Sequence, residues 1–280
     1  MDTSLPLASP HLAAPPACLG VDLAGMERHE TGIALLRGGR LELLTTAATD
    51  DDILRFAALA GREAMVAINA PLTLPRGRCC LDDDCPCRHD PGTRSREVER
   101  VLGRMRVPTL ATALLKVLAR RGMRLAAALR ASGWEPLEVY PYATLRLLGL
   151  PTAGKRTELG RRRIHDALCP LVPGLARPDA SEHQLDAVAC AYTAHLWRQG
   201  RARTVGDPAE GLMVIPDVAI APPVTAPSHN DTAPTLARVA EERAAYDVGA
   251  ADPGGRPDSE GVGAGARGSF TPSAAATGDV

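Results

Sequence analysis

The sequence has few aromatic residues and no long apolar segment. Phe, Trp and Tyr make up 3% of the 280 residues, so Leu, Val and Ala must fill any core. No run of about 18 uninterrupted apolar residues occurs, which excludes a membrane-spanning helix. Residues 1–16 have scattered prolines and no basic cluster. This argues against a signal peptide, and the cytoplasm is the expected location.

Composition divides the chain into three parts. Residues 1–17 are rich in Pro and Ala without periodicity, and we expect a disordered leader. Residues 218–280 are rich in Pro, Ala, Gly, Ser, Thr and Asp. Such a segment cannot bury enough surface to offset its ordering entropy, so we expect a disordered tail. Residues 18–217 remain as one folded domain.

Apolar runs and turn signals in this domain predict the order β-β-β-α-β-α-β-α. The expected strands lie at about residues 18–23, 30–36, 40–46, 65–68 and 136–140, with a small further strand at 211–215. Gly38-Gly39 is a hairpin signal, Thr49 is a helix cap, and Ser181–Gln184 is a capping box that opens the last helix. Three antiparallel strands followed by alternation predict a ribonuclease H-like α/β fold, a five-stranded mixed sheet flanked by helices.

An insertion at about residues 72–132 separates the fourth and fifth strands. Helices are expected there at 94–105, 109–121 and 123–131, with the last two broken at Gly122. Residues 76–130 contain 13 Lys and Arg against six Asp and Glu, a net charge of +7. Such an excess predicts a surface that faces an anion.

The insertion also contains four of the seven cysteines, Cys79, Cys80, Cys85 and Cys87, followed by His89. Zinc favours four thiolate or imidazole ligands in a tetrahedron, so these thiols form a candidate structural zinc site with His89 as a spare ligand. Their spacing is not the common Cys-x-x-Cys. A redox or disulfide pair and unligated thiols are therefore alternatives.

Polar residues end or interrupt several apolar segments. Asp22 ends the first strand, Asn69 follows the fourth, Glu138 lies in the fifth, and Asp186 lies in the last helix. A lone carboxylate in an apolar strand costs several kcal/mol unless it is paired or binds a metal. Convergence of these groups would make a cation site. In the alternative interpretation, Asp22 caps a turn, Glu138 is exposed at an edge, and Asp186 complements a helix dipole.

Five blocks resemble, in order, those of a family known as domain of unknown function 429. They are Gly20–Gly25, Ile68–Leu72, Glu138–Pro141, Lys155 and His183–Ala187. The family is described as predicted nucleases of ribonuclease H fold, and the resemblance covers roughly Cys18–Pro216.

The resemblance implies hydrolysis of nucleic-acid phosphodiesters by two Mg²⁺ or Mn²⁺ ions, with Asp22, Glu138 and Asp186 as ligands and Asn69 and Lys155 beside them. The family usually has Asp where this chain has Asn69. An amide ligates Mg²⁺ more weakly and cannot act as a base, so the site works with three acids or its activity is reduced.

Two other functions compete with the nuclease. A nucleic-acid-binding module with a degraded site would use the basic insertion and its cysteines. Gly20–Gly25 also resembles the first phosphate loop of sugar kinases and actin-like ATPases. Those proteins need two such domains, for which about 200 ordered residues leave no room.

The remaining polar residues near these blocks have two interpretations each. Lys155, Arg156 and Arg161–Arg163 would contact phosphates or form a solvated helix face. His183 would assist proton transfer or lie at the surface. Tyr140 and Tyr142 are the only aromatic pair near the predicted site, so base-specific recognition has little support.

Overall fold

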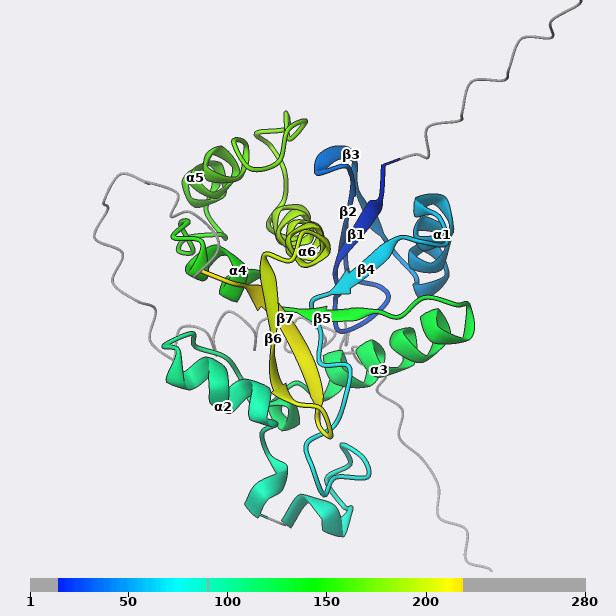
Figure 1. Ribbon diagram of the computed structural model, residues 1–280. Helices are drawn as coiled ribbons and strands as arrows, with labels where there is room; N and C mark the ends of the chain where they lie inside the picture. The colour runs from blue at the N-terminus through cyan, green and yellow to red at the C-terminus, as the bar shows by residue number, and fades with distance from the viewer. Residues whose placement is uncertain (1–14, 90, 219–280) are drawn as a thin grey trace, which may run out of the picture. The chain divides into compact units, whose positions relative to one another are not determined.

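The computed structural model describes residues 15–89 and 91–218 (Figure 1). The predicted leader and tail lie outside these residues, apart from residues 15–17 and 218. The described part of the chain forms one seven-stranded mixed sheet and six α-helices. An α/β fold is therefore confirmed.

The sheet begins with the three antiparallel strands that the sequence predicts. They are β1 (Ala17–Asp22), β2 (Thr31–Arg37) and β3 (Arg40–Ala47). β1 pairs with β2, and β2 with β3. Gly38 and Gly39 form the turn with φ of 58° and 85°, a region that favours glycine.

Two parallel strands extend the sheet, also as predicted. The capping box of Thr49 and Asp52 opens α1 (Asp50–Ala60), after which β4 (Met65–Ile68) pairs in parallel with β1. β5 (Leu137–Val139) pairs in parallel with β4. The carboxyl ends of β1, β4 and β5 thus lie at one edge of the sheet.

The predicted number of five strands is wrong, because a C-terminal hairpin adds β6 (Ala202–Asp207) to β7 (Gly211–Pro216). The strand order is β3-β2-β1-β4-β5-β7-β6, with β7 parallel to β5. The sequence signalled β7 as a small terminal strand but not β6. As an edge strand, β6 leaves Arg203 and Thr204 exposed and therefore lacks an apolar run.

Helix α6 (Glu182–Arg198) covers one face of the sheet and lies against β1 and β2 (Figure 1). Two glycines allow this approach. A Cβ at Gly20 would lie 2.0 Å from the carbonyl oxygen of Ala187, and one at Gly32 would lie 2.0 Å from that of His183. α4 (Pro141–Leu147) and α5 (Glu158–Leu168) complete this layer, whose core includes Cys18, Ala67 and Val139.

Helices α1 and α3 (Lys116–Ala131) cover the opposite face, against Val21 and Ile68. The predicted break at Gly122 is wrong, because α3 runs through it. Gly122 serves packing instead. A Cβ there would lie 2.8 Å from both the Cβ of Ala70 and the carbonyl oxygen of Pro71.

The rest of the insertion packs against the C-terminal hairpin. Helix α2 (Glu97–Arg104) places Val98 and Leu102 against Val205, Met213 and Ile215. Single 3-10 turns occur at Pro86–His89, Pro91–Thr93 and Thr112–Leu114.

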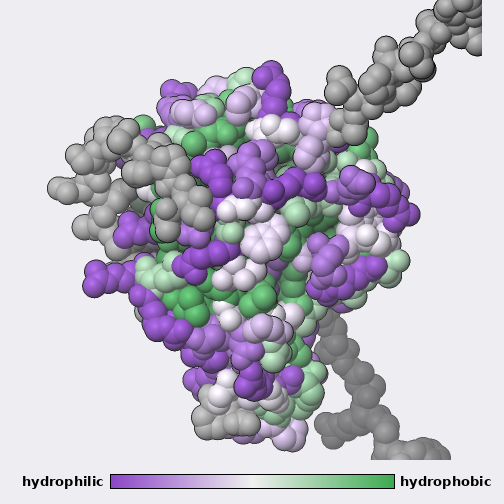
Figure 2. All heavy atoms as spheres, in the orientation of Figure 1, coloured by the Kyte–Doolittle hydropathy of each residue, from purple (hydrophilic) through white to green (hydrophobic). Residues whose placement is uncertain are grey.

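The described helices include none with the length and apolarity needed to cross a bilayer. Hydrophilic and hydrophobic residues are interspersed over the face shown in Figure 2.

Candidate functional site

Asp22 and Asn69 meet where β1 and β4 end. Parallel pairing places Val21 beside Ile68, so the two residues that follow are neighbours. The Asn69 Nδ2 donates to Asp22 Oδ1 at 2.6 Å, and the Asn69 backbone N–H donates to the Val21 carbonyl at 2.9 Å. Asp22 is 1% exposed and lies on the α6 side of the sheet, since it alternates with Val21. Its carboxylate is thus buried but hydrogen-bonded.

Helix α6 brings two further predicted residues to Asp22. His183 Nδ1 lies 2.9 Å from Asp22 Oδ2. Burial disfavours the imidazolium, but the hydrogen bond and charge of Asp22 outweigh it and raise the pKa of His183 to about 9. At neutral pH this pair is therefore ionic, and the interpretation of His183 as a surface residue does not hold.

Asp186, one helical turn after His183, forms an ion pair with Lys155 through its Oδ1. The Lys155 and Asp186 side chains are each 15% exposed. Burial raises the pKa of Asp186 to about 6; Lys155 opposes this, and the nearby charge of Asp22 adds to it. Burial opposes the charge of Lys155 as well, but Asp186 and then Asp22 raise its pKa overall. Two carboxylates and two cations thus form one group, which we call the Asp22–Asp186 cluster.

Glu138 does not join this cluster. It pairs in register with Ile68, whose side chain lies on the α1 and α3 side, while its neighbour Val139 lies on the α6 side. The Arg96 guanidinium binds both Glu138 oxygens, at 2.8 Å and 2.5 Å. The Leu72 backbone N–H donates to Oε2 at 2.9 Å. Among the predicted ligands, the structure therefore brings Asp22 and Asp186 together and leaves Glu138 on the other face.

Arg96 is the centre of a buried network that sequence reasoning missed. It is 1% exposed, and besides Glu138 it binds Glu99, with its Nη2 2.8 Å from Oε1. Its Nη1 also donates to the Thr73 hydroxyl at 2.8 Å. One Arg among many in a basic insertion gives no sequence signal of burial. The network joins the loop after β4, the start of α2 and the end of β5.

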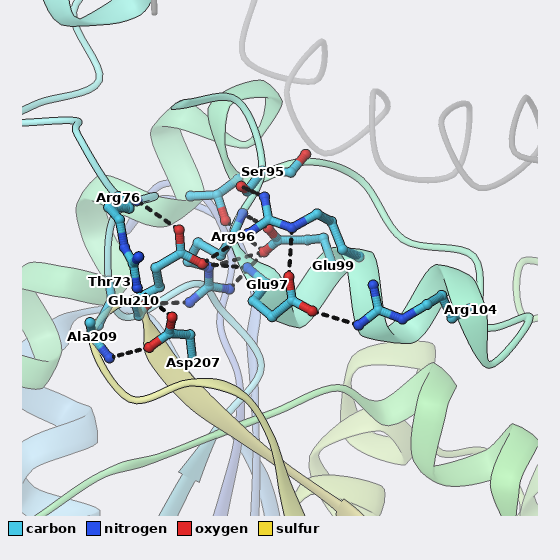
Figure 3. Close-up of polar contacts among 12 residues, drawn as sticks. Thr73, Arg76, Ser95, Arg96, Glu97, Glu99, Arg104, Asp207, Ala209 and Glu210 are labelled. Carbon is cyan, nitrogen blue, oxygen red and sulfur yellow. Dashed lines mark hydrogen bonds and ion pairs between the residues drawn. The ribbon is translucent and has the colours of Figure 1, made fainter. Parts of the chain in front are cut away.

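Glu210, in the turn of the C-terminal hairpin, is a second acid that sequence reasoning missed. It is 3% exposed and accepts hydrogen bonds from the backbone N–H groups of Arg76 at 3.0 Å and Glu97 at 2.5 Å. Figure 3 shows Glu210 and Asp207 reaching from the hairpin toward Arg76 and Glu97. The hairpin thus holds both ends of the cysteine-containing loop.

The four insertion cysteines converge. The ligand atoms of Cys79, Cys80, Cys85 and Cys87 lie within 4.8 Å of one another, and His89 is not part of this group. The Sγ atoms of Cys79 and Cys85 are 3.4 Å apart, and those of Cys80 and Cys87 are 3.9 Å apart. The Cys79 backbone amide and the Cys85 thiol lower the pKa of Cys87 to about 6, which favours a thiolate in the group.

Acidic residues of the same loop fix it to α3. Asp83 pairs with Lys116 and Asp82 with Arg120. The segment between Cys80 and Cys85 therefore turns back on itself, and the ion pairs of Asp82 and Asp83 hold it against α3.

The basic residues before and within α5 have mixed roles. Arg161 Nη1 donates to the carbonyls of Lys155 at 3.3 Å and Arg156 at 3.2 Å, so it holds the loop that carries Lys155. Arg156, Arg162 and Arg163 are exposed. Tyr140 and Tyr142 are buried, which leaves neither ring as a stacking platform.

The fold and this site define an α/β protein with a partly buried acidic and basic cluster at the carboxyl ends of β1 and β4. The chain belongs to the family described as protein of unknown function (DUF429), whose model matches residues 20–211. That range includes Asp22, the cysteine loop and Glu210. No curated protein and no solved structure matches the chain.

Proposed function

We propose that this protein is a divalent-metal-dependent nuclease that hydrolyses nucleic-acid phosphodiesters at the Asp22–Asp186 cluster. The carrying observation is that His183 of α6 contacts Asp22 at the end of β1, which brings Asp186, one turn later on the same helix, to the same edge of the sheet. The strand order β3-β2-β1-β4-β5 supports a ribonuclease H-like core, to which the β6–β7 hairpin is an addition.

The chemistry of the donors fits a hard cation. Asp22, Asp186 and the Asn69 side chain offer carboxylate and amide oxygens, the atoms that Mg²⁺ and Mn²⁺ prefer. In the structure, the positive charges of Lys155 and His183 offset the negative charges of the two carboxylates. A bound divalent cation would lower the pKa of a coordinated water and polarise a phosphoryl oxygen.

The other residues of the site would orient the metal ligands and bind the substrate phosphates. Asn69 and His183 fix the Asp22 carboxylate from two sides. Lys155, whose ammonium pairs with Asp186, would contact a phosphate of the substrate. The exposed Arg156, Arg162 and Arg163 would neutralise the neighbouring phosphates of the strand.

Cleavage assays test this proposal. Labelled DNA, RNA and hybrid duplexes would be incubated with Mg²⁺ or Mn²⁺ and the wild type, Asp22→Asn, Asp186→Asn or the control Asp51→Asn. Asp51 is an exposed acid at the start of α1. We expect at least a 100-fold loss of rate in the two site variants and none in the control. Equal wild-type and Asp22→Asn rates on every substrate would defeat the proposal.

Two observations favour the second candidate, a non-catalytic nucleic-acid-binding protein. Asn69 is neutral, and Glu138 is bound by Arg96 on the other face. Under this alternative, the protein would bind nucleic acid with an affinity that falls with salt and would cleave none of the substrates. Absence of binding would eliminate it.

We also propose that the four-thiol group binds a structural zinc ion. A tetrahedron with Zn–S distances of about 2.3 Å has edges of about 3.8 Å, close to the Sγ separations of 3.4 Å and 3.9 Å. Four thiolates would leave no coordination position for a substrate, so the ion would order the loop.

Elemental analysis of the purified chain tests the zinc proposal. We expect about one zinc ion per chain, lost in Cys85→Ser and kept in Cys169→Ser, a cysteine on the other side of the domain core. A zinc-free protein that stays zinc-free after incubation with ZnCl₂ would contradict it. Thiol counting would then show whether Cys79 and Cys85 form a disulfide.

A further inference from the structure

We propose that the Asp22–Asp186 cluster takes one divalent cation rather than two, and that the Lys155 ammonium supplies the positive charge of the missing second ion. This inference rests on the proposed nuclease function and specifies its metal requirement. It departs from the two-metal mechanism that the family resemblance implies.

The first support is the number of carboxylates. Four sequence positions were candidates for the metal site, but Asn69 is neutral and Glu138 is bound through both oxygens by Arg96. Only Asp22 and Asp186 remain. Two-metal sites hold their ions as a clamp around the attacking and leaving oxygens, and each ion needs carboxylate neighbours.

The charge balance points the same way. Two divalent ions with Lys155 and His183 would place six positive charges against two carboxylates. One divalent ion with Lys155 and the cationic His183 places four positive charges there, against six with two ions. With the single negative charge of a phosphodiester, one ion leaves an excess of one positive charge, whereas two ions leave an excess of three. Excess charge in a partly buried group is costly, since such groups are weakly solvated.

The second support is that the ammonium is built into the site. Lys155 pairs with Asp186 through one oxygen, Oδ1, and its own carbonyl is fixed by Arg161. The ammonium therefore occupies an Asp186 oxygen that a second cation would need as a ligand.

The choice of residue supports this as well. The chain has 32 Lys and Arg, and only Lys116 and Lys155 are lysines. An ammonium is a compact point charge, closer to a metal ion in size than the planar guanidinium that this chain uses almost everywhere else. Lys155 would keep its proton and pair with a non-bridging phosphoryl oxygen of the substrate.

Counting bound Mn²⁺ tests the inference. The full chain, with its thiol group saturated with zinc, would be titrated with Mn²⁺ and the free ion followed by electron paramagnetic resonance. The titration would be run with and without a phosphorothioate oligonucleotide. We expect one Mn²⁺ per chain in both cases and none in Asp22→Asn. Two ions per chain would overturn the inference but leave the nuclease proposal standing. No bound ion in either case would overturn both.

Lys155→Met separates the role of the ammonium from the role of the metal. We expect this variant to bind one Mn²⁺ at least as tightly as the wild type, because a repelling charge is gone, while cleavage falls at least 100-fold. Lys116→Met, which removes a half-buried lysine paired with Asp83, should change neither property. Unchanged cleavage, or loss of the metal from folded Lys155→Met, would overturn the inference.

Lys155→Gln serves as the second variant, since it keeps a hydrogen-bond donor for Asp186. This variant should fold, bind one Mn²⁺ as Lys155→Met does, and lose cleavage to the same extent. Full cleavage by folded Lys155→Gln would mean that the positive charge is not needed and would also overturn the inference.

Discussion

Asp22 shows how single residues set the properties of this site. Its oxygens contact an amide and an imidazole rather than further carboxylates. An Asp in place of Asn69 would bring another negative charge to within hydrogen-bonding distance of Asp22, and like charges that close raise each other's pKa. The neutral amide avoids this. In the proposed one-ion site, Asn69 and Lys155 would both lower the number of metal ions that the cluster needs.

The ion pair between His183 and Asp22 predicts a pH-dependent stability. The pKa of His183 is about 9 in the folded chain and about 6.5 when unfolded, so its contribution is complete below about pH 6.5 and is lost as the pH rises through about 9. One pKa unit corresponds to about 1.4 kcal/mol, which gives a decrease of roughly 3 kcal/mol. Urea unfolding at several pH values would measure it.

His183→Gln should remove most of this decrease. His195→Gln is the matched control on the same helix. Burial lowers the pKa of His195, so its titration cannot produce a loss of stability over this range, and the decrease should persist. A pH profile of His183→Gln that matches the wild type would contradict the assignment.

The buried pair of Arg96 and Glu138 gives a second prediction at this scale. Arg96→Met would leave the carboxylates of Glu138 and Glu99 buried without their partner, and we expect a loss of about 3–5 kcal/mol in unfolding free energy. Arg130→Met breaks an exposed pair with Glu135 and should cost less than about 1 kcal/mol. Denaturant titrations of both variants compare them directly, and similar losses would show that burial does not set the difference.

At the scale of elements, the contact of α6 with β1 and β2 decides the geometry of the cluster. Gly20 and Gly32 remove side chains that would hold the helix away. Gly20 faces Ala187 and Ala191 of α6, and Gly32 faces the backbone of His183. The helix therefore lies close enough for His183 to reach Asp22. Asp186 follows one turn later and meets the loop that carries Lys155.

Gly20→Ala tests the importance of this approach. Its Cβ would lie 2.0 Å from the Ala187 carbonyl and 2.4 Å from the Ala191 backbone nitrogen, so α6 must move. We expect a loss of at least about 3 kcal/mol in unfolding free energy, as overpacking against backbone cannot relax cheaply. Gly103→Ala, within α2 and with no atom within 4 Å of the added Cβ, should stabilise by up to about 1 kcal/mol. Equal effects in thermal unfolding would contradict the packing argument.

At the scale of the whole molecule, the basic excess of the insertion is largely neutralised. Within the part of the chain that the structure describes, at least nine of its 13 basic residues form an ion pair with an acid: Arg76, Arg88, Arg96, Arg100, Arg104, Lys116, Arg120, Arg121 and Arg130. Several of these acids lie outside the insertion. The net charge of +7 therefore serves to attach the insertion more than to face an anion, which weakens the support for the binding-module alternative.

Two matched sets of substitutions test which surface would contact the proposed nucleic-acid substrate. One changes Arg156, Arg162 and Arg163 to Gln, and the other changes Arg104, Arg120 and Arg130, all in an Asp22→Asn background without divalent ions. We expect the first set to weaken binding and to lower the salt slope by up to about 0.9 for each phosphate that is no longer neutralised. The second set should have little effect. Fluorescence anisotropy across salt concentrations would measure both effects. If the second set weakened binding and the first did not, the binding surface would lie on the insertion.

Local patterns in the sequence determined much of this protein. The first five strands, the cap at Thr49, the capping box at Ser181 and the positions of Asp22 and Asn69 at strand ends follow from near neighbours along the chain. All five resembling blocks lie within the residues that the family model matches. The four clustered cysteines are also visible as a group in the sequence, before folding brings their thiols together.

Tertiary structure decided the rest, because it depends on contacts between distant segments. Strand register and the helices on each face placed Asp22 and Glu138 on opposite sides of the sheet. The alternation of apolar and polar residues along a strand does not reveal the register or which helices cover each face. Burial of Arg96 and Glu210 depends on how the insertion meets the β6–β7 hairpin. The approach of Lys155 to Asp186 joins residues 31 positions apart, and only the packing of α6 against the sheet brings them to Asp22.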